Sequence, residues 1–127
     1  MTKDVLIVTP KNLREFVAKL PRFRHHFREM FTPEFPFLPA QLELMANVLE
    51  AAASGLNEAI PMLTTAEVLV AMVQVTGGER FPNSRAEFHD DAVMVSKVIH
   101  RNRSALQRFA GTKGVLWTNI EPNPVLE

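Results

Sequence analysis

The chain has 127 residues, of which 46% are hydrophobic and 22% are charged, and its 14 basic residues balance its 14 acidic ones. This composition predicts one compact domain with a modest core, and the zero net charge gives no general attraction to nucleic acid or to an anionic membrane. The absence of cysteine excludes disulfides, thiolate zinc sites and a cysteine nucleophile.

The first predicted elements are a short extended segment and a helix. Residues 5–8 form an apolar run before Thr9 and Pro10, a pair that suits the start of a helix. This run is too short for a signal-peptide core, and no later stretch is long enough to span a membrane, so we expect a cytoplasmic protein. Apolar residues then recur every three or four positions up to residue 31. They predict a helix kinked at Pro21, or two short helices nearly in line.

The middle of the chain predicts two further helices. The prolines at 33, 36 and 39 favour a stiff connector, and a helix with an apolar face follows from Pro39 to Gly55. Thr64 and Glu67 then have the spacing of a capping box. The run VLVAMVQV behind them is apolar on nearly every side, which predicts a central, buried helix that ends at the glycine pair 77–78.

The last predicted helix begins near Ser84 or Asp90 and continues to Ala110, with Gly111 as the residue that ends it. The segment GVLWTNI behind it is apolar and extended, and it is a candidate to pair with DVLIVT as two short strands. We therefore expect a single mainly α-helical domain over residues 1–127. It is a compact bundle of four or five helices, with extended termini at 1–9 and 112–127.

Charge is distributed in blocks along the chain. Six basic residues lie from Lys11 to Arg28, no lysine or arginine occurs from residue 29 to 79, and five basic residues without an acid run from Lys97 to Lys113. Opposite blocks can pair with each other when the chain folds. The alternative is a basic surface, built from the first and last helices, that binds an acidic partner: Arg22, Arg24, His25, Arg28, Arg101 and Arg103.

The segment EFHDD at residues 87–91 carries the densest group of chemically active side chains. Glu87, Asp90 and Asp91 fall on one face in the first two turns of the predicted helix, where the helix dipole favours negative charge without any ligand. The alternative is a magnesium or manganese site. In that site the three carboxylates are joined by His89 and, from another helix, by His25 and Glu29.

One part of the chain is similar to a known family. Residues 64–110 combine an apolar helix, a loop with Pro82, and Asp90, Asp91 and Ala92 at the start of a second apolar helix. This pattern resembles the YkvA-like domain, a small helical bacterial family of unknown function. Asn83 stands where that family has a loop aspartate, and the second proline and the glycine of its loop are missing. The resemblance implies a helical domain with the two aspartates at a helix start. It assigns no activity, because the activity of the family is unknown.

The sequence favours a small non-catalytic interaction protein that acts as a regulator, an inhibitor or an assembly component and holds no cofactor. Its partner is another protein or a second copy of the chain. The runner-up is a metal-binding protein or metal-dependent enzyme built on the carboxylates at the start of the last helix. A third possibility is nucleic-acid binding through RFRHHFR in the basic first helix, although the phenylalanines of this segment lie on the predicted core face.

Overall fold

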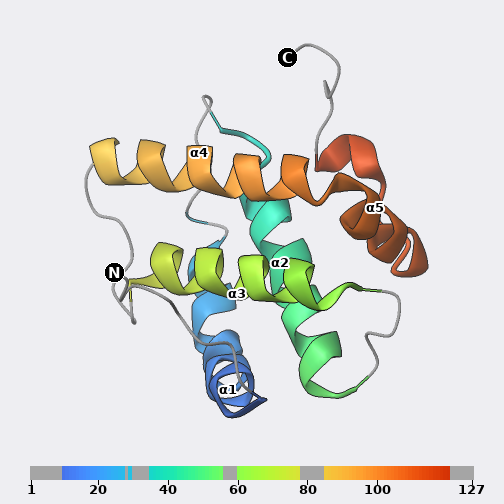
Figure 1. Cartoon of the computed structure of the whole chain (residues 1–127). Coiled ribbons are helices and arrows are strands. Elements are labelled where there is room, and N and C mark those ends of the chain that lie inside the picture. The colour runs from blue at the N-terminus through green and yellow to red at the C-terminus, as the bar shows by residue number, and fades with distance from the viewer. Residues whose placement is uncertain (1–9, 28, 30–34, 56–59, 78–84, 121–127) are drawn as a thin grey trace.

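Figure 1 shows the computed structural model of the chain, which describes residues 10–27, 29, 35–55, 60–77 and 85–120. For Pro10 and residues 85–88 it describes the backbone alone. The helices are α1 (Pro10–Phe27), α2 (Leu38–Ala53), α3 (Met62–Thr76), α4 (Arg85–Arg101) and α5 (Arg103–Thr112), followed by the 3-10 helix η3 (Trp117–Asn119). The prediction of a mainly α-helical bundle of four or five helices is confirmed. None of the helices in these ranges has both the length and the apolar character needed to cross a membrane.

The central helix of the bundle is α2. Helices α1, α3 and α4 all pack against it, and in Figure 1 it runs behind α3 and α4, which lie side by side across it. Its buried residues occupy more than one face: Leu38, Leu42, Leu44, Met45, Ala46, Val48, Leu49 and Ala51. The run VLVAMVQV, residues 68–75, was predicted to form a central helix buried on nearly every side. It does pack against three helices, α1, α2 and α4, but the predicted burial on nearly every side is wrong, because Val70 and Val73 are exposed. That run lies in α3, which is buried on one side only.

The first helix carries one apolar stripe into this core. Its buried residues follow each other at steps of three and four, which is the pattern of one helix face: Leu13, Phe16, Leu20, Phe23 and Phe27. The rings of Phe16 and Phe23 lie 5.3 Å apart between centroids. Pro21 is exposed, and α1 continues through it as a single helix. Of the two sequence-based alternatives, a single helix through Pro21 is observed rather than two short helices.

Helices α3 and α4 run antiparallel, and α4 ends earlier than predicted. Helix α4 is interrupted at Asn102, whose backbone angles are φ −111° and ψ 27°, and the chain then continues as α5. The Asn102 side chain donates from Nδ2 to the carbonyl oxygen of Val98 at 3.0 Å, a local bond that competes with helix continuation. The predicted single helix to Ala110 is therefore two helices. Gly111 lies inside α5, and the residue with a left-handed backbone is Gly114, at φ 72°.

The described C-terminal residues return to the core. Ile120 is buried, and its carbonyl oxygen accepts a hydrogen bond from Gln41 Nε2 in α2 at 3.0 Å. The sequence predicted an extended segment here. Residues 117–119 instead form one 3-10 turn, so the segment is not extended throughout. Residues 1–9 and 121–127 are outside the described part of the chain, and the predicted strand pairing of the two termini falls partly on them.

Candidate interaction surface

One side of α3 is apolar and exposed to solvent. Met62, Leu63, Val70 and Val73 keep exposed fractions of 86%, 68%, 40% and 36%. At about 100° per residue, these four positions and the half-buried Ala66 fall within an arc of about 100° around the helix. We call this set of five residues the α3 face.

The α3 face exists because α3 is apolar nearly all round but packs on one side only. The opposite side is buried against α2, α4 and α1 through Thr64, Thr65, Val68, Leu69, Ala71, Met72, Val75 and Thr76. In Figure 1, α3 lies between α4 above and α1 below, and no other described helix covers its outer side. Large contiguous apolar patches are uncommon on monomeric proteins, so this exposed side of α3 is a candidate interaction surface.

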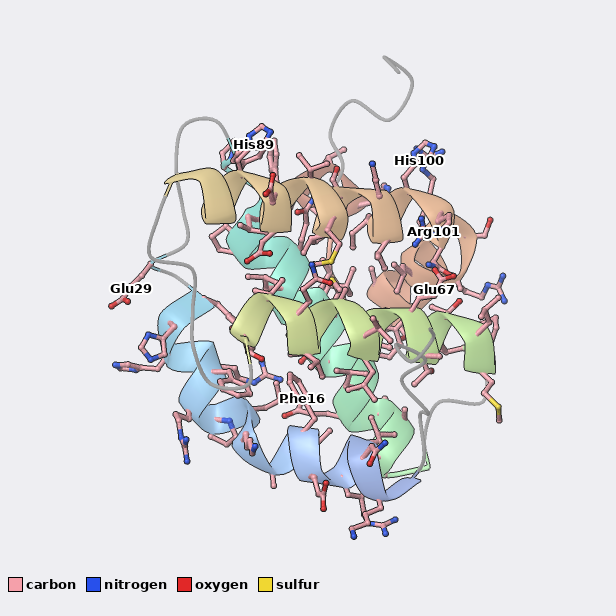
Figure 2. All side chains as sticks on the ribbon, turned by 60° about the vertical axis from the view of Figure 1, so that its left-hand side comes forward. Phe16, Glu29, Glu67, His89, His100 and Arg101 are labelled. Atoms are coloured by element: carbon pink, nitrogen blue, oxygen red, sulfur yellow. The ribbon has the colours of Figure 1, made fainter. Side chains whose placement is uncertain are left out.

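A polar cluster holds the edge of α3 that faces α4. Thr64 Oγ1 donates to Asn102 Oδ1 at 2.8 Å, and Asn102 Nδ2 donates to Glu67 Oε1 at 2.8 Å. Arg101 Nε donates to the same carboxylate oxygen at 3.2 Å, and Figure 2 shows both side chains between α3 and α4. The bond from Asn102, with help from the bond and charge of Arg101, lowers the pKa of Glu67, although burial opposes the shift. The cluster therefore joins an ionised glutamate on α3 to the corner between α4 and α5.

This cluster replaces the predicted capping box. Helix α3 begins at Met62, so Thr64 and Glu67 lie inside it, and both side chains turn toward Asn102. The capping box was wrong because the partner of both residues lies more than 30 positions later in the chain, where local spacing carries no signal. Asn102 itself was missed, since an asparagine within an apolar helix pattern was read as part of an unbroken helix.

The second half of α4 and the whole of α5 expose basic side chains beside this cluster. Lys97, His100 and Arg101 are exposed on α4, and Arg108 is exposed on α5. His100 points to the side of α4 away from Glu67 (Figure 2), and its Nδ1 lies 2.8 Å from Nη2 of Arg103. No aspartate or glutamate occurs between residues 97 and 113. We call this region, Lys97 to Lys113, the basic end.

The basic residues of α1 are separate from the basic end. Arg24 is bound to α2: its Nη1 donates to Glu43, and its Nη2 donates to Asn47 at 3.0 Å and to Glu50 at 2.7 Å. The first basic block and the acidic block therefore do pair within the fold, as one reading of the charge pattern predicted. Arg22 and His25 are exposed on α1, whereas Arg28 lies outside the described residues. Arg22 and His25 lie on α1, whereas Arg101 and Arg103 lie on α4 and α5, and α3 lies between α1 and α4 in Figure 1. The predicted basic surface stays a prediction.

The candidate metal ligands lie at two distant places. His89 and Asp90 are exposed in the first two turns of α4, and Asp91 is half-buried there, while the side chain of Glu87 is outside the described part. The His89 ring packs edge-on against Phe35, with centroids 5.4 Å apart.

The second half of the predicted metal set is His25, exposed in the last turn of α1, and Glu29, just beyond the end of α1. Glu29 Oε1 is 3.6 Å from Nδ1 of His26, and Figure 2 shows Glu29 and His89 pointing in different directions. Among the side chains that the structure describes, no three histidines or carboxylates are grouped to hold a metal. Magnesium or manganese binding at the start of α4 stays a prediction.

Comparison with known proteins adds no relative. The chain matches no family model, no curated protein and no solved structure. The resemblance of residues 64–110 to the YkvA-like family therefore stays a prediction, and the surface of the molecule is the basis for a functional proposal.

Proposed function

We propose that this protein is a non-catalytic interaction module that binds a protein partner through the α3 face. One observation carries the proposal: α3 leaves Met62, Leu63, Val70 and Val73 exposed although its other side is fully packed in the core. An apolar helix face of this width is suited to a partner helix, whose side chains at steps of three and four pack against it.

Two polar clusters in the described part support this choice, because their side chains bind to partners within the fold. Arg24 ties α1 to α2, and Glu67 with Asn102 ties α3 to the corner between α4 and α5. Both clusters stabilise the packing of the helices that surround α3. A binding surface on helices held in this way loses little conformational entropy when a partner binds.

Site-specific cross-linking tests the proposal. A photoreactive amino acid is placed at Leu63 or at Val70 of the full chain in its native cells, and at the exposed Ala18 on α1 as the control position. We expect an adduct of one defined mass from positions 63 and 70 and none from position 18. The same adducts from all three positions, or none from the α3 face, would refute the proposal.

A charged substitution gives a second test. Leu63→Lys should remove the adduct formed at position 70, and it should change the free energy of unfolding by no more than about 0.5 kcal/mol, because Leu63 is 68% exposed. Loss of the adduct together with a large loss of stability would instead mean that Leu63 belongs to the core.

A further inference from the structure

We infer that the partner segment which docks on the α3 face is an amphipathic helix whose apolar stripe is bordered by aspartate or glutamate. This inference rests on the proposed function and adds the chemistry of the partner. It follows from the shape of the α3 face and from the charges along its edge.

The shape of the α3 face fits one helix. Leu63, Ala66, Val70 and Val73 are spaced by three and four residues, so they form a stripe one helix wide along α3. From residue 62 to residue 73 the stripe is about 17 Å long, at a rise of about 1.5 Å per residue. A partner helix with apolar residues at positions i, i+3 or i+4, and i+7 covers this length.

The edge of the α3 face along α4 is basic. Arg101 is bound to Glu67 on α3, and Lys97 lies one turn earlier on the same side of α4. Glu67 is already held by Asn102 and Arg101, and Asp90 lies nearly two turns before Lys97, toward the other end of α3. Carboxylates on the partner therefore meet the exposed Lys97, with Arg101 one turn away, beside the middle of the α3 face.

A second copy of the chain fits this edge poorly. A two-fold antiparallel pairing of two α3 helices brings the α4 edge of one protomer, with its exposed Lys97, beside the α4 edge and the Lys97 of its partner. Like charges that face each other oppose association. One helix face is also small beside the roughly 800 Å² that each partner buries in a stable dimer.

Three synthetic helical peptides test the inference. All have about 18 residues, or about five turns, and the same leucine stripe. Their bordering residues are glutamate, glutamine or lysine. Titrated with the full-length protein by fluorescence anisotropy in about 0.1 M salt, the glutamate peptide should bind most tightly and the lysine peptide at least about tenfold more weakly. The difference should shrink toward 1 M salt, where the Debye length falls from about 10 Å to about 3 Å.

Matched variants locate the effect. Lys97→Glu should remove most of the preference for the glutamate peptide, whereas Arg14→Glu, an equal change of charge at an exposed position on α1, should leave it in place. Val70→Lys should weaken all three peptides, because it disrupts the shared apolar stripe. Arg101 is left unchanged in these variants, since it stabilises the fold through Glu67.

Each of the remaining outcomes refutes the inference, and the measurements distinguish these outcomes from one another. Equal binding of the three peptides refutes the acidic border, and the proposed function stands if position 63 still forms its cross-link. Self-association in sedimentation that Val70→Lys abolishes assigns the α3 face to a second copy. Co-sedimentation with phosphatidylserine vesicles that Lys97→Glu abolishes, without any peptide preference, assigns it to an anionic membrane. Failure of both peptide binding and cross-linking refutes the inference and the proposed function together.

Discussion

Two adjacent threonines on α3 should respond in opposite ways to the same substitution. Thr64 and Thr65 are both buried, with exposed fractions of 3% and 6%. Thr64 Oγ1 donates to Asn102 at 2.8 Å, whereas within the described part of the chain Thr65 Oγ1 has no hydrogen-bond partner. Replacement by valine keeps the shape and the helix propensity nearly constant. The two variants therefore differ mainly in whether the lost hydroxyl made a hydrogen bond.

The expected magnitudes follow from these contacts. Thr64→Val removes one buried hydrogen bond and leaves Asn102 Oδ1 without this donor, which should lower the free energy of unfolding by about 1 to 2 kcal/mol. Thr65→Val removes a hydroxyl that was desolvated without compensation, which should raise it by about 0.5 to 1 kcal/mol.

Urea denaturation measures both effects, and an unchanged slope with denaturant shows that the unfolding transition itself is preserved. In a thermal melt, each kcal/mol corresponds to about 3 to 5 °C for a domain of this size. A loss of stability in Thr65→Val would refute the reasoning, because it would mean that the hydroxyl has a partner in solution. Equal effects of the two substitutions would refute the role of Asn102.

Three further predictions test other parts of the fold. Arg24→Met should lower the free energy of unfolding by about 1 to 3 kcal/mol in urea, since it strands two half-exposed glutamates, and Arg14→Met on the same helix should change it by less than about 0.5 kcal/mol. Glu67→Gln should cost stability at neutral pH, and the cost should shrink as the pH falls below the ordinary pKa of 4.5: a group with a lowered pKa stabilises the fold only while ionised. A cost that stays constant down to pH 3 would contradict this. Gly111→Ala should raise the melting temperature because Gly111 lies inside α5 with open space around it, whereas Gly55→Ala should lower it because Gly55 has a φ of 78°.

Much of the helical pattern could be predicted from local sequence. The steps of three and four in Leu13, Phe16, Leu20 and Phe23 are a property of one segment, and they were sufficient to predict the buried side of α1. The start of α1 at Pro10 is equally local. Both predictions rely on residues no more than a turn or two apart.

The errors arise where distant residues decide the structure. An apolar run looks the same whether a helix is buried all round or on one side, so the sequence could not show that α3 keeps Val70 and Val73 exposed. The central position of α2 also depends on three other helices packing on it. Asn102 ends α4 while it binds Thr64 and Glu67 on another helix, a role that its neighbours in the sequence do not reveal.

The packing around α2 and the exposure of one side of α3 determine how freely each helix can change in sequence during evolution. Because α2 is covered by α1, α3 and α4, and its glutamates at 43 and 50 are bound by Arg24, almost every change along it meets a packed neighbour. The outer side of α3 meets none of the described helices. A library of random single substitutions should therefore tolerate few replacements between residues 42 and 49. Apart from proline and glycine, which would destabilise the helix itself, intolerance at 62, 63, 70 and 73 should come from selection for binding. A library sorted first for folding and then for activity would separate the two.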